Sequence, residues 1–211
     1  MLLYLSRHAQ TASSAIDSFN GQRELPLTEV GRAQARKLGL RLAQVPWTAV
    51  YRSPLGRTGE TAALIAPGSA AHILPGLIEI NYGAWEGLSP GEARALNPLH
   101  YDAWVKDPSQ LGPPGGETAA QVAERALAAL DQILAVGGPG PVLAVSHKAT
   151  LRILAAALTL SPIGSYRTRW PQDECALNLI ELRRDKPPFL RLWNDTSHLD
   201  ADPGKATRAG K

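Results

Sequence analysis

Three short apolar runs, each followed by a helical pattern, most constrain how this chain can fold. They cover residues 2–6, 48–52 and 142–146. Apolar runs of this length are typical of strands that are buried on both faces of a parallel sheet. Strands and helices alternating in this order predict an α/β fold. We expect a three-layer sandwich, with a mostly parallel central sheet and helices on both faces.

Helix signals lie between the predicted strands. Residues 28–45 carry apolar side chains at helical spacing, and Pro54 can occupy the first position of a helix that contains residues 58–65. The spacing of Ser89 and Glu92, and that of Thr118 and Gln121, is the spacing of a capping box, which predicts two further helix starts.

The later part of the chain predicts a hairpin and an excursion. Residues 177–182 and 189–193 read as two strands that extend the sheet as a C-terminal hairpin. Residues 76–116 are rich in Gly, Pro and Trp, and we expect them to form a covering excursion with two short helices. We expect residues 1–200 to form a single domain and residues 201–211 to be a disordered tail.

Composition narrows the classes of partner. The 211 residues carry a net charge of +3, but residues 201–211 hold three basic residues and one acid, so the remainder is close to neutral. This charge distribution argues against nucleic acid as a partner. The single cysteine, Cys175, excludes an internal disulfide and a Cys-rich zinc site.

The distribution of apolar residues bears on location. The apolar start stops at Arg7, which is too early for a signal peptide. No apolar run approaches the roughly 20 residues that cross a bilayer. We therefore expect a cytoplasmic protein without a membrane partner, and the sequence is compatible with a homodimer.

Polar residues follow the predicted strands where each strand ends. The first strand leads to Arg7 and His8, the second to Ser53 and then Arg57 at a helix start, and the third to His147. Singly, such residues are more often structural or solvated, but ligands of open α/β sheets bind beyond the carboxyl ends of the strands. Arginine and helix N-termini both suit a phosphate dianion. The shared position therefore predicts a phosphate site.

The residues around this position resemble a known family. Arg7-His8-Ala9-Gln10-Thr11 resembles the Arg-His-Gly-Glu/Gln-Thr signature of the histidine phosphatase superfamily, the phosphoglycerate-mutase-like proteins. Further blocks are similar to the family in the same order, and they lie at residues 25–35, 53–62, 79–87, 115–118, 145–147 and 194–199. The resemblance covers residues 2–199.

The resemblance implies a role for each matching residue. His8 would be the nucleophile that forms a phosphohistidine. Arg7, Arg57 and His147 would bind the transferring phosphoryl group, and Glu79 would donate a proton to the leaving oxygen. Phosphoryl transfer depends mainly on positioning and charge neutralisation. Two guanidinium groups and an imidazolium can supply that charge.

Other features of the motif concern the pocket wall and the need for metal. Gln10 and Thr11 lie where the family lines its pocket. The sequence shows no His-x-x-x-His pair and no Cys cluster, and no close Asp pair provides a ligand set, so we expect no metal ion and no cofactor.

Three positions depart from the family pattern. Ala9 replaces a glycine, which fits without strain if the backbone φ there is negative. Ser14 stands where the family has Asn, and its shorter side chain would reach less far toward the phosphate. Lys148-Ala149 replaces Gly-Gly after His147, and the Lys148 ammonium could reach an acidic group on the substrate. These changes affect the choice of substrate and remove no catalytic group.

These observations predict a metal-independent phosphatase that hydrolyses a small phosphorylated metabolite through phospho-His8. The alternative enzyme is a cofactor-dependent phosphoglycerate mutase. The compact segment between the Glu79 and His147 blocks favours hydrolysis. A non-catalytic phospho-ligand module is disfavoured by the intact set of motif residues, and a phosphoprotein phosphatase by the covering excursion.

Overall fold

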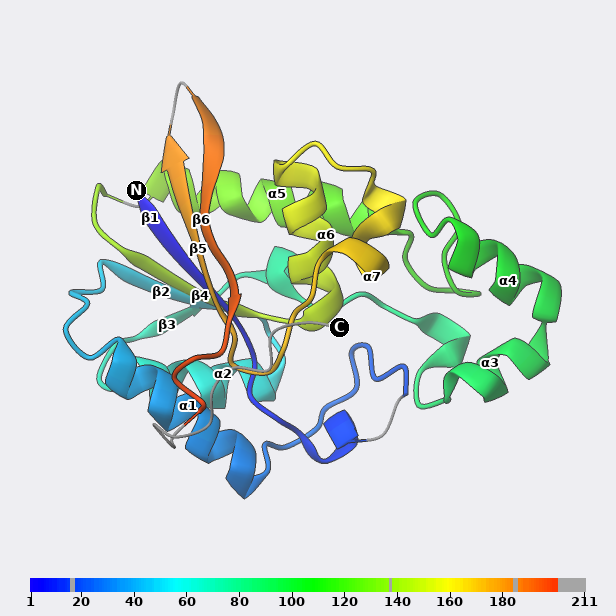
Figure 1. Cartoon of the computed structure of the whole chain (residues 1–211), viewed down its shortest axis with the longest axis horizontal. Helices are drawn as coiled ribbons and strands as arrows, with labels where there is room; N and C mark the ends of the chain where they lie inside the picture. The colour runs from blue at the N-terminus through cyan, green and yellow to red at the C-terminus, as the bar shows by residue number, and fades with distance from the viewer. Residues whose placement is uncertain (16–17, 137, 184–185, 201–211) are drawn as a thin grey trace.

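The computed structural model describes residues 1–15, 18–136, 138–183 and 186–200. In this part of the chain, six strands form one sheet in the order β3-β2-β4-β1-β5-β6 (Figure 1). The first four strands of this order run parallel to one another. Strand β5 is antiparallel to β1, and β6 is antiparallel to β5. The predicted α/β fold with a mostly parallel sheet is confirmed. The strands are β1 Leu2–Arg7, β2 Ala49–Arg52, β3 Ala71–Ile73, β4 Val142–Ser146, β5 Leu177–Arg183 and β6 Lys186–Asp195.

Helices cover both faces of the sheet (Figure 1). Helices α1 (Glu29–Arg41) and α2 (Gly56–Ile65) pack against one face, and α5 (Ala119–Val136) and α6 (Lys148–Leu158) pack against the other. These layers agree with the predicted sandwich. The remaining helical elements are η1 Ala12–Ala15, η2 Pro75–Leu77, η3 Gly83–Trp85, α3 Pro90–Leu96, α4 Pro98–Lys106, η4 Ile163–Ser165 and α7 Tyr166–Arg169.

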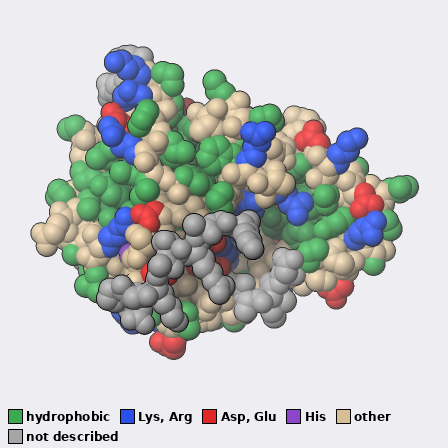
Figure 2. Space-filling view, viewed as in Figure 1, with side chains coloured by type: hydrophobic (Ala, Val, Ile, Leu, Met, Phe, Trp, Pro, Cys, Tyr) green, Lys and Arg blue, Asp and Glu red, His purple; other side chains and the backbone are tan. Residues whose placement is uncertain are grey.

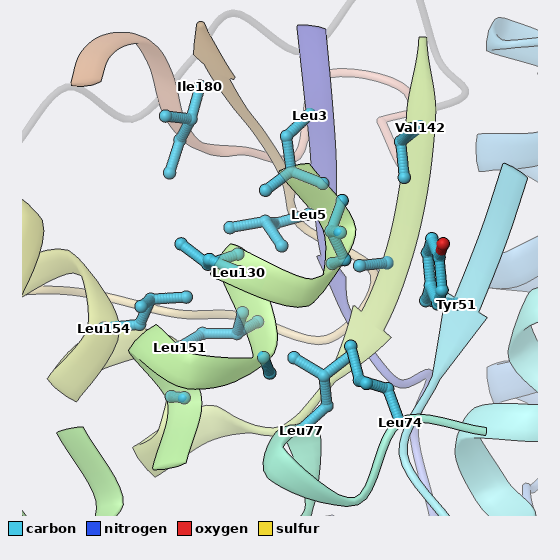
Figure 3. Close-up of a cluster of buried hydrophobic side chains, with 14 of the residues drawn as sticks. Leu3, Leu5, Tyr51, Leu74, Leu77, Leu130, Val142, Leu151, Leu154 and Ile180 are labelled. Atoms are coloured by element: carbon cyan, nitrogen blue, oxygen red, sulfur yellow. The ribbon is translucent and has the colours of Figure 1, made fainter. Parts of the chain in front are cut away.

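The main core lies between the sheet and the α5–α6 layer (Figure 3). Leu3 and Leu5 of β1 point to this side and contact residues such as Leu130 of α5 and Leu151 of α6. Each fully buried leucine stabilises the fold by about 1.5–3 kcal/mol. Every residue of β4 is buried, because β4 is a central strand with helices on both faces. That is why the sequence there is a continuous apolar run rather than an alternating one.

Several local predictions can be compared with the structure. The side chain of Ser89 accepts a hydrogen bond from Glu92 N in a capping box, and Thr118 and Gln121 bond reciprocally before α5. The predicted hairpin is β5–β6. Pro54 lies two residues before α2 instead of at its first position. The edge strand β3 was not predicted, because three residues are too few for a pattern.

The segment 76–116 contains helices α3 and α4, which project to one side of the sheet (Figure 1). An aromatic cluster packs beneath them, and it includes Phe19, Trp85, Tyr101 and Trp104. Trp85 and Trp104 are almost completely buried, with ring centroids 5.0 Å apart. Aromatic packing therefore holds this segment against the body of the protein. No helix among the described residues is long and apolar enough to span a membrane.

Candidate active site

The ends of three parallel strands bring the first site residues together. The strands are in register, so that Arg7 pairs with Ser146 and Arg52 with Val145. Beyond the strand ends, His8 N donates to Ser146 O at 2.9 Å. The imidazole centroids of His8 and His147 are 5.2 Å apart. The expected convergence at the carboxyl edge of the sheet is therefore present.

The ring of His8 is oriented by its own backbone neighbour. Nδ1 lies 2.8 Å from the carbonyl oxygen of Ala9. Because a carbonyl can only accept, Nδ1 carries the hydrogen, and Nε2 of the neutral ring keeps its lone pair. Burial lowers the pKa of His8 well below its usual value, and the charges of Arg7 and Arg57 lower it further. At neutral pH, His8 is a neutral imidazole with Nε2 available as a nucleophile.

Two buried arginines flank His8. Arg7 at the end of β1 donates to Gln172 O at 2.9 Å and forms an ion pair with Glu174, with 2.8 Å between Nη2 and Oε1. Arg57, in the first turn of α2, donates to the carbonyls of Gly21 and Arg23 at 2.9 and 2.7 Å. These bonds fix both guanidinium groups before any ligand binds. Such preorganised charge suits a phosphoryl group.

The turn that holds Arg57 requires a glycine. Gly21 has a φ of +48°, in the left-handed region that glycine adopts without strain. A Cβ at this position would lie 2.1 Å from Oε1 of Glu86. The carbonyl of Gly21 can therefore face Arg57 only because position 21 has no side chain.

His147 lies next to His8 and is completely buried. Its Nε2 is 2.7 Å from Oγ of Ser53, while its Nδ1 is buried without a hydrogen-bond partner among the described residues. Burial, followed by the nearby ring of His8 and the charge of Arg57, lowers the pKa of His147 well below its usual value. The expectation of an imidazolium at this position is therefore corrected. The ring is neutral at neutral pH, because desolvation and neighbouring positive charge disfavour its protonation.

Glu79 is held at the N-terminus of α6. Its Oε1 accepts from Thr150 N at 3.0 Å and from the Thr150 hydroxyl at 3.1 Å, and its Oε2 accepts from Ala149 N at 3.2 Å. Arg125 of α5 donates to the carbonyl oxygens of Ile78 and Glu79, which ties the loop to the body. Glu79 is buried, with 8% of the residue exposed, and these hydrogen bonds fix the orientation of its carboxyl group.

The side chains of Arg7, His8, Arg57 and Glu79 line one cavity of about 550 Å³, whereas His147 is not among its lining residues. Thr11 and Lys148 also line this cavity, and the sequence predicted both as pocket residues. Gln10 does not, because its Oε1 accepts from the Thr28 hydroxyl at 2.8 Å and so serves the start of α1. The side chain of Ser14 lies outside the described part of the structure. The predicted site residues that line the cavity are Arg7, His8, Thr11, Arg57, Glu79 and Lys148.

The substitution of the motif glycine by Ala9 causes no strain. Among the described residues, the non-glycine residues with positive φ are Leu160, Cys175 and Asn194. Ala9 therefore has a negative φ, and its completely buried methyl group belongs to the core cluster next to α1 and α2. The negative φ is the condition under which alanine fits this position without strain.

Sequence reasoning missed the outer wall of the cavity. That wall includes Phe19, Tyr82, Tyr101, Arg152, Tyr166 and Arg167. Arg152 could have been found, because it lies one helical turn after Lys148 on α6. Tyr166 and Arg167 carry no motif signal, since the fold alone brings α7 to the cavity.

Comparison with known proteins agrees with this geometry. The family model described as histidine phosphatase superfamily (branch 1) matches residues 3–196. The chain belongs to this superfamily. Its structure superposes on that of YhfR from Bacillus stearothermophilus with a TM-score of 0.87 and 31% identity, covering 94% of this chain and 99% of the other.

Two curated relatives differ in how much of their length this chain spans. A bifunctional protein of Mycobacterium tuberculosis is 33% identical over 93% of this chain, which spans only 54% of that relative. The chain thus covers about half the length of that protein. Phosphoserine phosphatase 1 of Hydrogenobacter thermophilus is 29% identical, with 93% of both chains covered. Other relatives are named metal-independent phosphoserine phosphatase, adenosylcobalamin/alpha-ribazole phosphatase and probable phosphoglycerate mutase.

Proposed function

We propose that this chain is a metal-independent phosphatase that hydrolyses a small phosphomonoester metabolite through a phosphohistidine on His8. The observation that carries the proposal is the tautomer of His8. The Ala9 carbonyl holds the hydrogen on Nδ1, and burial keeps the ring neutral, so Nε2 is free to attack. The fixed guanidinium groups of Arg7 and Arg57 lie close enough to His8 to lower its pKa, and they supply positive charge for a phosphate.

In the first step, the lone pair of His8 Nε2 attacks phosphorus, and the bond from phosphorus to the leaving oxygen breaks. Glu79, in its protonated form, gives its proton to that oxygen, and the alcohol leaves. Arg7, Arg57 and the His147 ring stabilise the charge on the phosphoryl oxygens. A proton donor positioned at the leaving oxygen typically contributes about 10²–10⁴-fold to the rate.

In the second step, water attacks the phosphorus of phospho-His8. Glu79, now a carboxylate, accepts a proton from that water, and the bond between phosphorus and Nε2 breaks. Inorganic phosphate is released, and both His8 and Glu79 return to their starting protonation states. The cycle uses no metal ion, and the name of one relative, a metal-independent phosphoserine phosphatase from Arabidopsis thaliana, supports this feature.

The alternative is a phosphoglycerate mutase, in which phospho-His8 returns its phosphoryl group to the substrate. Relatives named as probable mutases keep this alternative open. The segment from Glu79 to His147 is compact and contains the two short helices α3 and α4 between η3 and α5, which favours hydrolysis. The cytoplasmic location and the homodimer stay predictions.

A screen of phosphorylated metabolites tests the proposal. Each substrate is incubated with the purified chain, and both inorganic phosphate and isomerised product are measured. Hydrolysis predicts stoichiometric release of phosphate, with little isomer. Isomer formed without release of phosphate would identify a mutase, and no turnover of any phosphomonoester, including phenyl phosphate, would refute both.

A further inference from the structure

The cavity carries more positive charge than one phosphate group requires. Its wall includes five cationic side chains, and Glu79 is the one carboxylate among the lining residues that the structure describes. Two of the cations, Arg7 and Arg57, flank His8. The other three, Lys148, Arg152 and Arg167, come from α6 and α7, and Figure 2 shows Lys and Arg side chains between the body and the part that holds α3 and α4.

The guanidinium of Arg167 is fixed but has no anionic partner in the part of the chain that the structure describes. It stacks over the ring of Trp104, with 4.2 Å between Cζ and the ring centroid. Within the described residues, Arg167 forms no ion pair with a carboxylate, unlike Arg7. A guanidinium that stacks on an aromatic face keeps its N–H edge for an acceptor.

Tyr166 adds a second and independent observation. Tyr166 is 1% exposed and lines the cavity, and its hydroxyl has no hydrogen bond of good geometry among the described residues, although the side chain of Tyr82 is near enough to act on its pKa. Burial raises the pKa of Tyr166 to about 12, so the phenol stays protonated at neutral pH. A bound acceptor would give this buried hydroxyl a hydrogen bond of good geometry, which stabilises a buried polar group.

Arg152 positions these two residues. Its Nε donates to the carbonyl of Tyr166 at 3.0 Å, and its Nη2 donates to the carbonyl of Arg167. These bonds tie α7 to α6 and hold both side chains at the cavity wall. Arg152 is therefore a positioning residue for α7.

We propose that Arg167 and the hydroxyl of Tyr166 form a second anion-binding subsite, which takes a carboxylate or a second phosphate on the leaving group of the substrate. This inference rests on the proposed phosphatase function and narrows its substrate class. The unreacted end of the substrate would lie against α7 while its phosphate lies against His8. Neutral or purely aromatic leaving groups would leave Arg167 and Tyr166 without an acceptor.

Matched substrates and variants test the subsite. Phosphoglycerate and glycerol phosphate differ by a carboxylate, and propanediol bisphosphate and propanediol monophosphate differ by a phosphate. For each pair, kcat/KM of the substrate with the extra anionic group is divided by kcat/KM of the substrate without it. This ratio is measured for wild type, Arg167→Leu and Tyr166→Phe. Arg169→Leu is the control, because Arg169 is an exposed residue of the same helix and does not line the cavity.

We expect Arg167→Leu to lower the ratio of one pair by about tenfold, as expected for the loss of a partly desolvated charge contact. Tyr166→Phe should lower the same ratio by a smaller factor, and Arg169→Leu should leave it unchanged. The pair whose ratio falls identifies the group, carboxylate or phosphate. Arg169→Leu should hydrolyse phenyl phosphate within about twofold of the wild-type rate, and the ratios correct for any general loss of activity in Arg167→Leu and Tyr166→Phe.

Unchanged ratios for both pairs in Arg167→Leu would overturn the subsite while leaving the phosphatase function intact. If wild type hydrolyses nothing, including phenyl phosphate, the proposed function fails, and the subsite is then decided by calorimetry. In that case, about tenfold weaker binding of one anionic substrate to Arg167→Leu, without a change for its neutral counterpart, supports the subsite. Equal binding by wild type and variant refutes it.

Discussion

The hydroxyl oxygen of Ser53 lies 2.7 Å from Nε2 of His147, and both side chains are completely buried. Oγ of Ser53 also accepts from Leu55 N at 3.3 Å. We infer that the hydroxyl hydrogen points to Nε2, which leaves the hydrogen of the neutral ring on Nδ1. That N–H is unpartnered among the described residues, and in the proposed mechanism it donates to a phosphoryl oxygen.

The bond from Ser53 predicts a measurable effect on catalysis. In Ser53→Ala, Nε2 of His147 loses its donor, and both tautomers of the ring become populated. We expect kcat/KM to fall by about tenfold for every phosphomonoester, which corresponds to about 1.4 kcal/mol. Steady-state kinetics give the rate, and nitrogen NMR of labelled histidine gives the tautomer. An unchanged rate with an unchanged tautomer would rule out this role for Ser53.

The two buried histidines make stability depend on pH. The pKa values of His8 and His147 are lowered in the folded chain, chiefly by burial. In the unfolded chain they bind protons near pH 6.5, the ordinary value. Below about pH 6.5 the unfolded state therefore gains protons that the folded state does not, and the free energy of unfolding decreases as the pH falls. Above this value their contribution to stability is fully present.

Urea denaturation at a series of pH values between about 7 and 5 measures this slope. We expect a shallower slope for His8→Asn than for wild type, because one of the two titrating groups is absent. Equal slopes for the two proteins would show that His8 does not titrate differently in the folded and unfolded states.

The role of Glu79 is tested by the choice of leaving group. If Glu79 donates a proton to the leaving oxygen, Glu79→Gln should slow the hydrolysis of an alkyl phosphate by about 10²-fold or more. An activated aryl phosphate should be almost unaffected, because its leaving group needs little protonation. Kinetics with both substrates provide the measurement, and thermal unfolding checks that the variant is folded. Equal slowing of the two substrates would mean that Glu79 has another role.

The positive charge that phosphoryl transfer requires comes from the protein in our account. Arg7 and Arg57 are buried, oriented by backbone carbonyls and close enough to His8 to influence its pKa. We expect kcat/KM to be unchanged after exhaustive dialysis against a chelator. The assay is repeated with added magnesium, zinc and manganese. Loss of turnover that a divalent ion restores would contradict this account of the charge.

The sequence predicted those parts of the site that follow directly from strand ends. Arg7 and His8 could be placed because a buried parallel strand delivers the next residues to the ligand-binding edge. The protonation of His147 could not, because it depends on burial and on neighbouring charges that only the folded chain brings together. The position of the Gln10 side chain could not be predicted either, because its hydrogen-bond partner Thr28 is distant in the sequence.

The outer wall of the cavity shows why the rest could not be predicted. Tyr166 and Arg167 lie on α7, a helix of four residues with no periodicity to detect. Their place depends on Arg152 of α6 and on the stacking of Arg167 over Trp104, which are tertiary contacts. Residues that select the leaving group are therefore harder to predict than those that bind the phosphate.

The phosphohistidine itself is the most direct test of the mechanism. The protein is exposed briefly to a radiolabelled phosphomonoester, denatured and analysed for covalent phosphate, with His8→Ala as the control. We predict phosphate that is labile to acid and stable to base, located on His8 by mass spectrometry of the peptides and absent from His8→Ala. Label that is undiminished in His8→Ala, or that is found on another residue, would contradict the central claim that Nε2 of His8 is the nucleophile.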